Sequence, residues 1–366
     1  MRRYLKIIRN VDWTIPILTL ILFTGGVAIL YSAAFQKFQE TGVHFSLRQI
    51  LWFSISCIGF IMAAVYPYRK LVHLAYPLYL LNVILLILTL LLGLVRFGAQ
   101  RWLALGGFIF QPSELAKLIV TLTLAQYMGH NRERISSFRG TLTAAILMGI
   151  PLILIAAQPD LGTALTLVPI FFALLLVAEI PLRWILFWIG LTSLAAPFLW
   201  ILLKEYQRDR LIVFLNPNVD PLGAGYTIIQ SKIAIGSGGL LGKGWFSGTQ
   251  NQLNFLPERH TDFIFSVVGE EWGFLGGMIL LLLYFLLIRK LVQITQQTNE
   301  PYGRLLGVGI TTLIAVHILV NIGMTTGVMP VVGLPLPFIS YGGSNLLTIM
   351  IGLGLMVNIQ RNRTIF

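Results

Sequence analysis

Long apolar runs are the feature that most restricts what this chain can fold into. The hydrocarbon core of a bilayer is ~30 Å thick, so a helix needs ~20 apolar residues to cross it. With 56% hydrophobic and 11% charged residues, the chain is also far more apolar than soluble proteins. The sequence therefore predicts an all-α integral membrane protein, a polytopic bundle of ten transmembrane helices. The ten runs cover 14–33, 47–66, 71–95, 112–128, 140–157, 160–178, 184–203, 263–288, 305–326 and 343–359.

Basic residues in the short connecting segments indicate which side of the membrane each segment faces. Cytoplasmic loops are enriched in Lys and Arg, whereas long loops cross largely regardless of charge. If residues 1–13 form a cytoplasmic tail, 15 of the 26 Lys and Arg residues lie on the cytoplasmic side. The tail has no small-residue cleavage site, so we expect it to be retained. We expect a single domain over 1–366, with a second cytoplasmic tail at 360–366 and an extracytoplasmic loop at 204–262 between helices 7 and 8.

Four polar segments then share the extracytoplasmic side: 95–111, 158–162, 204–262 and 327–344. The long loop contains NPNVDPLGAGY, whose Asn, Pro, Asp and Gly residues favour turns. The stretch IIQSKIAIGSGGLLGKGW that follows is too short and too polar to span a bilayer, so we expect a re-entrant or interfacial helix there. No internal repeat is visible, which weakens an assignment as a transporter built from inverted repeats.

Several classes of function are disfavoured by the sequence. The net charge of +12 comes from basic residues scattered between apolar runs, without the contiguous basic stripe typical of nucleic-acid binding. The single cysteine, Cys57, lies in an apolar run and provides neither a disulfide nor a cysteine metal site. GSGGLLGKG has Ser237 at the first glycine position and Gly244 after the lysine of the phosphate-loop pattern, so we exclude an ATPase. His260 has no second histidine nearby in sequence, which argues against zinc.

Ionisable side chains at membrane depth are costly and are therefore paired or functional. In QPSELAKL, Glu114 and Lys117 are three residues apart, on one helix face, and can form an ion pair. Pro112 before them suits the first turn of a helix. Asp160 in QPDLGTAL can cap the following helix. For all three ionisable residues, a purely structural role and a functional role both remain open.

The segment LPERHTDFIF, residues 256–265, places four ionisable residues immediately before an apolar run. Asp262 can cap the helix that follows, with Thr261 as a competing cap. A cap requires none of the other three residues, which are Glu258, Arg259 and His260. We therefore expect a functional cluster at the membrane surface here. Basic residues on or near the same side would suit an anionic headgroup, since Arg matches phosphate geometry: Arg48, Arg96, Arg101, Arg210, Lys232, Lys243 and Arg259.

Four motifs together resemble the SEDS family of cell-wall proteins, over nearly the whole chain and in the family's order. They are RWLALGGFIFQPSELAKL (101–118), QPDLGTAL (158–165), LPERHTDFIFSVVGEEWGFLG (256–276) and GLPLPFISYGGSNL (333–346). Arg259 and the short tails resemble the elongation branch of the family more than its division branch. Ala104 departs from the pattern, because an acidic residue is frequent there, and we expect it to tune the external loop without abolishing activity.

The resemblance implies an inverting peptidoglycan glycosyltransferase, active in cell elongation and cell shape, that polymerises lipid II on the outer face of the bacterial cytoplasmic (inner) membrane. It also implies a class B penicillin-binding protein, a transpeptidase, as partner within the elongation complex. Asp262 matches the family's catalytic aspartate. Glu114, Lys117 and Asp160 match polar positions associated with the family's central cavity, and we expect Ser344 to belong to that cavity as well.

On this basis we expect Asp262 to accept the proton of the attacking sugar hydroxyl. Arg48, Arg101, Lys117 and Arg210, with or without a divalent cation such as Mg²⁺ or Mn²⁺, would stabilise the leaving pyrophosphate. No organic cofactor is expected, and apolar furrows between helices would hold the lipid tail. The rival interpretations are a flippase that moves lipid II, which predicts ionisable residues continuing to the cytoplasmic side, and a scaffold that recruits a partner enzyme.

Overall fold

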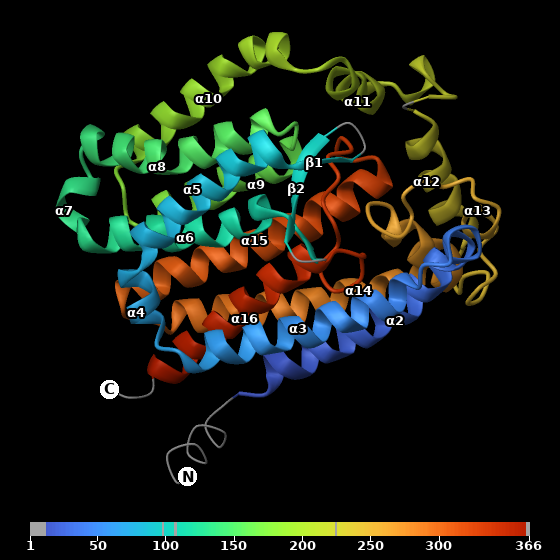
Figure 1. Cartoon of the computed structure of the whole chain (residues 1–366), viewed down its shortest axis with the longest axis horizontal. Helices are drawn as coiled ribbons and strands as arrows, with labels where there is room; N and C mark the ends of the chain where they lie inside the picture. Colours follow the sequence, from blue (N-terminus) through green and yellow to red (C-terminus); the bar gives the residue numbers. More distant parts are fainter. Residues whose placement is uncertain (1–11, 97–98, 106–107, 224, 364–366) are drawn as a thin grey trace.

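The computed structural model describes residues 12–96, 99–105, 108–223 and 225–363, and it is a bundle of long helices with one small sheet (Figure 1). Each of the ten apolar runs overlaps one long helix. These helices are α2 (Thr14–Thr41), α3 (Phe45–Val65), α5 (Ala75–Leu92), α6 (Pro112–His130), α8 (Phe138–Ala157), α9 (Leu161–Val177), α10 (Leu182–Leu202), α14 (Ile264–Gln296), α15 (Pro301–Thr326) and α16 (Gly343–Arg363).

Seven helices in the described part of the chain are long and apolar enough to cross a membrane, namely α2, α3, α5, α8, α14, α15 and α16. α9 and the part of α10 from 182 to 195 are apolar but shorter. α6 begins with Pro112 at its first turn, as expected, and carries Glu114 and Lys117 close to that start. The expected tails fall partly outside the described residues, which exclude 1–11 and 364–366, and α16 is helical as far as Arg363.

The short elements lie between the long helices. They are α4 (Tyr68–His73), α7 (Arg132–Ile135), α11 (Glu205–Leu215), the 3₁₀ helix η1 (Pro217–Val219), α12 (Tyr226–Ser237) and α13 (Thr249–Gln252). Residues 71–73, which we expected to begin the third span, belong instead to α4, and α5 starts at Ala75. The reason is that α4 is amphipathic: Tyr68 and Val72 are buried while its basic residues are exposed.

The expectation of an all-α protein is wrong for the segment 95–111. This segment contributes to an antiparallel sheet of three strands in the order β1-β2-β3, comprising β1 (Leu94–Arg96), β2 (Ala99–Leu105) and β3 (Phe108–Phe110). Leu103 pairs with Phe110, and Ala104 with Ile109. Aromatic and branched side chains suit the pleated surface of a sheet. Because this segment is not helical, its backbone N–H and C=O groups form hydrogen bonds between its own strands instead.

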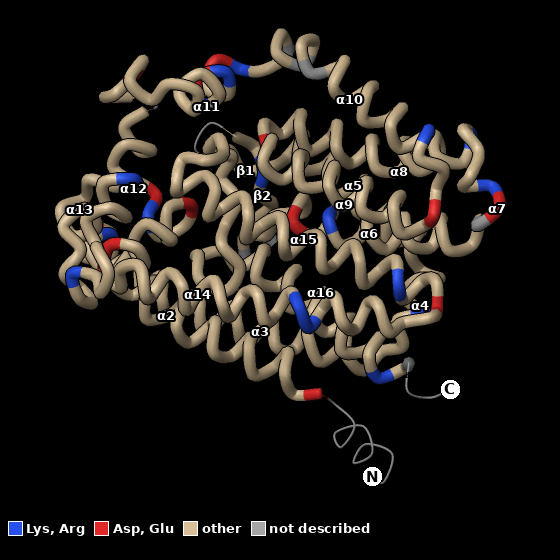
Figure 2. The backbone as a smooth tube through the Cα atoms, turned by 180° about the vertical axis from the view of Figure 1, so that it is seen from behind, with Lys and Arg blue, Asp and Glu red and all other residues tan. Residues whose placement is uncertain are grey.

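The connecting elements separate to two ends of the bundle. In Figure 1, α4, α7, the start of α2 and the end of α16 lie at the left, whereas α11, α12 and α13 lie at the right. Figure 2 shows Lys, Arg, Asp and Glu concentrated at the ends of the bundle, with few between them. Within the long loop, α12 packs against α14 and α15. The loop therefore contains a helix, α12, in the stretch where the sequence predicted one, and this helix docks on the bundle.

α15 and α16 form the centre of the bundle, while α3 and α5 lie at its edge. The apolar windows of α16 and α15 are 78% and 61% buried, against 17% for α3 and 22% for α5. α16 packs mainly on α3, and α15 packs on α14, α9 and α6. α10 lies at the edge of the bundle in Figure 1 and contacts α9. Polar residues on α15 and α16 are therefore held away from lipid.

Candidate functional site

Asp262 lies in a turn that leads into α14. The carbonyl oxygen of Glu258 accepts hydrogen bonds from the backbone N–H groups of Thr261, Asp262 and Phe263, at 3.1, 3.0 and 3.3 Å. This turn orients the half-buried Asp262 toward a cavity of about 230 Å³. The structure thus brings together three predicted residues, Asp262, Glu258 and Arg210. The lining residues are Arg210, Val213, Thr227, Ile228, Pro257, Glu258, Asp262, Phe263 and Val331.

The surroundings of Asp262 make its carboxylate unusually basic. Burial and, second, the charge of Glu258 raise the pKa of Asp262 from 3.8 to about 6. Arg210, a hydrogen bond from Thr261 and Arg101 act in the opposite direction. A carboxyl group with a pKa near 6 is mostly ionised at neutral pH, yet accepts a proton far more readily than an exposed aspartate. Asp262 is therefore suited to act as a general base.

Gly333 lies beside the Asp262 carboxylate. Its backbone has a φ of +74°, and a Cβ built there would lie 3.3 Å from Oδ2 of Asp262. Any other residue would strain the backbone and crowd the carboxylate, because L side chains rarely adopt a positive φ. The positive φ and the lack of space for a Cβ beside Asp262 thus explain the glycine of the GLPLP segment.

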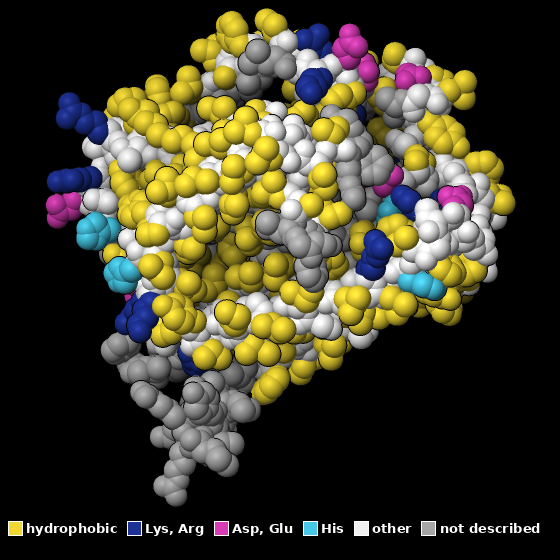
Figure 3. Space-filling view, viewed as in Figure 1, with side chains coloured by type: hydrophobic (Ala, Val, Ile, Leu, Met, Phe, Trp, Pro, Cys, Tyr) yellow, Lys and Arg dark blue, Asp and Glu magenta, His cyan; other side chains and the backbone are white. Residues whose placement is uncertain are grey.

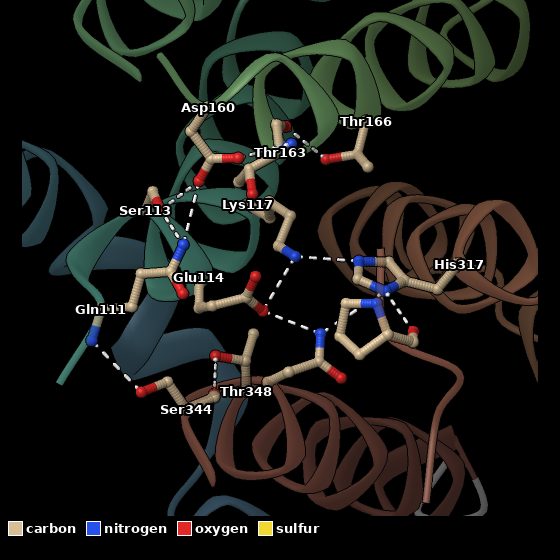
Figure 4. Close-up of polar contacts among 12 residues, drawn as sticks. Gln111, Ser113, Glu114, Lys117, Asp160, Thr163, Thr166, His317, Ser344 and Thr348 are labelled. Carbon is tan, nitrogen blue, oxygen red and sulfur yellow. Dashed lines mark hydrogen bonds and ion pairs between the residues drawn. The ribbon is translucent and has the colours of Figure 1, made fainter. Parts of the chain in front are cut away.

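Glu114 and Lys117 form the buried ion pair expected from their spacing on α6. Nζ of Lys117 lies 2.9 Å from Oε2 of Glu114, and the two side chains are 0% and 5% exposed. Nζ also lies 2.8 Å from Nε2 of His317 on α15, and Nδ2 of Asn345 on α16 donates to Glu114 at 2.8 Å. Figure 4 shows this network joining three helices. His317 and Asn345 could not be paired with Glu114 and Lys117 from the sequence alone.

Asp160 is the N-cap of α9, as its sequence position predicted. Its Oδ1 accepts from the backbone N–H of Thr163 at 3.3 Å. Its Oδ2 accepts from Gln111 Nε2 at 2.9 Å and from Ser113 Oγ at 3.2 Å. Nη1 of Arg101 approaches Asp160 at 3.6 Å, and Nη2 of Arg101 donates to the carbonyl oxygen of Pro159. Asp160 therefore joins the start of α9 to the start of α6, as Figure 4 shows, and its contact with Arg101 adds the strand β2.

Gln111, which binds Asp160 through its side chain, also contacts the motif at 333–346 through its backbone. Oγ of Ser344 on α16 accepts from the backbone N–H of Gln111 at 3.2 Å. Ser344 thus contacts the start of α6 rather than the cavity beside Asp262. Glu114, Lys117 and Asp160 are buried and Ser344 is half-buried, and none of these four residues lines the cavity.

Arg259 and His260 are absent from the cavity lining, although they neighbour Asp262 in sequence. The Arg259 side chain is buried and donates to the carbonyl oxygens of Ala33, at 2.9 Å, and Leu256, at 3.4 Å, and to Oδ1 of Asn254. It therefore anchors the turn to α2. Arg259 therefore does not line the cavity beside Asp262, because its guanidinium is engaged by these three acceptors.

His260 is packed against Lys37, a residue that the sequence did not single out. Nζ of Lys37 lies 3.4 Å from Nε2 of His260 and 3.9 Å from Oε1 of Glu258. Burial, then the charges of Lys37 and Arg259, lower the pKa of His260 to about 3. The imidazole is thus neutral at physiological pH and does not supply a positive charge to the site.

Of the remaining basic residues that the structure describes, Arg210 lines the cavity and Arg48 and Lys232 do not. Arg210 on α11 lines it, lies 5.8 Å from the Tyr206 ring centroid and donates to the carbonyl oxygen of Val331 at 3.3 Å. Arg48 is exposed in the first turn of α3, and Lys232 is exposed on α12. The side chain of Arg96 lies outside the part of the chain that the structure describes. Among the predicted cations, Arg210 has the most direct access to the cavity.

The glycine-rich stretch after α12, residues 238–248, packs against Glu270 and Glu271 of α14 and is not a phosphate-binding loop. Glu270 accepts from Lys243 Nζ at 2.8 Å and Thr249 Oγ1 at 3.1 Å, and Glu271 accepts from Ser32 Oγ at 2.6 Å. The loop approaches α14 where Gly273 breaks the helix with a φ of +65°. Lys243 is thus a surface cation that is already paired with a carboxylate.

The chain was compared with known proteins. The family model described as cell cycle protein, that of FtsW, RodA and SpoVE, matches residues 12–365. The peptidoglycan glycosyltransferase MrdB of Escherichia coli K12 is 43% identical, covering 97% of this chain and 94% of MrdB. The peptidoglycan glycosyltransferase RodA of Treponema pallidum is 32% identical, covering 96% and 98% of the two chains.

Solved structures are similar as well. A chain from a peptidoglycan synthase complex described as coordinating polymerization and crosslinking superimposes with a TM-score of 0.83 at 36% identity, covering 98% of this chain and 99% of that one. The rod shape determining protein RodA of Thermus thermophilus superimposes with a TM-score of 0.72 at 32% identity, covering 97% and 98%. The similarity in sequence and in fold therefore extends over essentially the whole chain.

Proposed function

This chain belongs to the FtsW, RodA and SpoVE family of cell cycle proteins, and from that premise we propose how it makes glycan strands. It is a multi-pass membrane protein and a peptidoglycan glycosyltransferase. The observation that carries the mechanism is the cavity in which Asp262, Glu258 and Arg210 meet at the start of α14. The substrate is lipid II, a disaccharide-peptide joined through pyrophosphate to a polyprenyl lipid.

Asp262 is the general base of the transfer. Its carboxylate takes the proton of the acceptor hydroxyl as the hydroxyl oxygen bonds to the anomeric carbon of the donor sugar. The bond from that carbon to the pyrophosphate oxygen breaks, and the lipid pyrophosphate leaves with the electron pair. One base and one stabiliser of the leaving group are sufficient for inversion. The raised pKa of Asp262 supports this role, because it increases the carboxylate's affinity for a proton.

Arg210 stabilises the leaving pyrophosphate. It lines the same cavity, and its guanidinium can pair with phosphate oxygens in a forked geometry. Arg101 contributes at longer range, because Asp160 and the Pro159 carbonyl already engage it. Lys117, which we expected beside the pyrophosphate, is fully buried between Glu114 and His317 and holds helices together instead.

The cavity could supply part of the ligand set of a divalent cation, Mg²⁺ or Mn²⁺, through its carboxylates. Within the described residues, no group of three or more His, Cys, Asp or Glu side chains could hold a metal ion. Mg²⁺ commonly binds through one or two carboxylates together with substrate phosphates. Glu258, the more exposed carboxylate of the cavity, would hold it with the pyrophosphate, and the cation would neutralise charge on the leaving group.

The apolar surface of the bundle accommodates the lipid. We propose that all ten long helices cross the inner membrane, with both termini cytoplasmic and the cavity on the outer side. Figure 3 shows yellow side chains covering most of the visible face, with a hollow at its centre. Retaining the polyprenyl chain among such side chains avoids a cost of ~0.8 kcal/mol per CH₂ group exposed to water.

The partner is a class B penicillin-binding protein, a transpeptidase of the elongation complex. The match to a chain of a peptidoglycan synthase complex that coordinates polymerization and crosslinking supports this assignment. Transfer of the growing strand to a crosslinking enzyme on the same membrane face is consistent with a cavity at the outer end of the bundle.

The first experiment compares lipid II polymerisation by the wild-type protein and by Asp262→Asn, each purified with its transpeptidase, using gel separation of glycan chains. Asp209→Asn is a matched control, because it removes an exposed carboxylate of α11 that does not line the cavity. We expect polymer from the wild type and from Asp209→Asn, and none from folded Asp262→Asn. Normal polymerisation by Asp262→Asn would overturn the assignment of the base. Transport of labelled lipid II across vesicles without polymerisation would instead support the flippase interpretation.

A further inference from the structure

In the turn that carries Asp262, three consecutive backbone carbonyl oxygens, those of residues 260–262, each accept a hydrogen bond from a different residue in the C-terminal part of the chain. The carbonyl oxygen of residue 260 accepts from the N–H of Tyr341 at 2.9 Å. That of residue 261 accepts from Oγ of Ser340 at 2.5 Å, and that of Asp262 accepts from Nδ2 of Asn321 at 3.0 Å. The turn that carries Asp262 is thus fixed to α15 and to the loop before α16.

Asn321 has a special place among these donors because it joins two backbone segments. Its Nδ2 also donates to the carbonyl oxygen of Leu334 at 2.7 Å, and its side chain is 0% exposed. Leu334 directly follows Gly333, which lies beside the Asp262 carboxylate. One amide on α15 therefore fixes both the backbone that carries the carboxylate and the loop beside the carboxylate.

His317, one turn earlier on α15, holds the adjacent residue of the same loop. Its Nδ1 lies 3.2 Å from the carbonyl oxygen of Pro335, and its Nε2 faces Lys117. With the Nδ1–H donated to Pro335, Nε2 is free to accept from the ammonium. The loop under Asp262 is thus attached to α15 at two successive carbonyls.

We propose that Asn321 is a positioning residue for glycosyl transfer, acting through the backbone of Asp262 and the loop that begins at Gly333. This proposal rests on the assignment of Asp262 as the base. Asn321 touches no substrate, since it is fully buried behind the turn. Displacing a catalytic group by about 1 Å can reduce the rate ~100-fold without changing how tightly substrate binds.

The test replaces Asn321 by leucine, which has nearly the same shape but no donor. Asn358 on α16 offers a matched control: it too is 0% exposed, and its Nδ2 donates to two carbonyl oxygens, those of Ala63 at 2.8 Å and of Tyr66. Asn358 lies among neighbours unrelated to the cavity. Both variants are assayed for lipid II polymerisation in complex with the transpeptidase, and rates are divided by the amount of folded protein.

We expect Asn321→Leu to lower kcat about 10- to 100-fold with KM for lipid II within about twofold of wild type. Asn358→Leu should retain wild-type kcat per folded molecule. Equal kcat in the two variants, or a loss in Asn321→Leu confined to KM, would overturn the proposal.

If Asn321→Leu does not accumulate as folded protein, Ser340→Ala provides the second variant, because it removes the donor to the neighbouring carbonyl of Thr261. It should also lower kcat at unchanged KM, and a wild-type kcat would overturn the proposal. The outcome for Asp262→Asn separates the two claims. If Asp262→Asn is inactive while Asn321→Leu behaves as its control, the positioning role alone is wrong. If Asp262→Asn is active, the assignment of the base is wrong.

Discussion

The pH dependence of polymerisation is a direct test of how the cavity tunes Asp262. A rise in pKa from 3.8 to about 6 corresponds to ~3 kcal/mol against the ionised form. The base must be ionised to act, so activity is present above the pKa and is lost as pH falls through it. At a pKa of 6, roughly 90% of the carboxylate is ionised at pH 7 and roughly 10% at pH 5. We therefore expect kcat/KM, which reports the pKa of the free enzyme, to fall about tenfold between pH 7 and pH 5.

The source of this shift can be tested with Glu258→Gln. After burial, the charge of Glu258 is the second cause of the raised pKa, so its removal should move the midpoint below 6. Glu205→Gln, which changes an exposed carboxylate in the first turn of α11, is the control and should leave the midpoint unchanged. The assay is the initial rate of lipid II polymerisation from pH 4.5 to 8, with the folded fraction measured at each pH.

Two results would refute this reasoning. One is a rate at pH 5 within twofold of that at pH 7, which an aspartate with an ordinary pKa of 3.8 would give. The other is an unchanged or higher midpoint in Glu258→Gln. Either result would mean that the environment of Asp262 in the working enzyme differs from the cavity described above.

Three further substitutions test the surrounding structure. Lys117→Met should lower the free energy of unfolding in detergent by ~3–5 kcal/mol, because it leaves Glu114 buried without its cation. Adding Glu114→Gln should recover part of that loss, and a double variant whose loss equals the sum of the two single losses would contradict this. Gly333→Ala should lower polymerisation sharply through strain and crowding of Asp262, whereas Gly25→Ala, where a Cβ meets nothing within 4 Å, should not. Arg259→Leu should reduce thermal stability but retain kcat per folded molecule, and a loss of kcat at unchanged stability would show that it contacts substrate.

The long helices and several polar contacts could be predicted because they depend on residues near one another in sequence. A run of ~20 apolar residues predicts a helix wherever it packs. Glu114 and Lys117 pair because residues three apart share a helix face, and Asp160 caps α9 because a carboxylate before a helix meets its free N–H groups. These predictions were confirmed without knowledge of the neighbouring helices.

Residues whose role depends on a distant partner could not be assigned in this way. Arg259 looked like a substrate contact because it neighbours Asp262, yet its side chain binds the carbonyl of Ala33, more than two hundred residues earlier. Lys37 and Asn345 carried no visible signal. His317 and Asn321 did carry one, since polar residues four apart in an apolar helix form a stripe that must face a polar partner. The identity of that partner was not encoded nearby.

The sequence by itself determined that this is a helical membrane protein with a carboxylate at the start of α14, because hydrophobic length, helix spacing and capping act over a few residues. Only the tertiary structure decided which charges face the cavity, which are bound to one another, and what holds Asp262 in place. The reason is that α15, α16 and the turn at 258–263 meet only after the bundle has packed, and burial and hydrogen bonds at their contacts then fix the geometry and the basicity of the site.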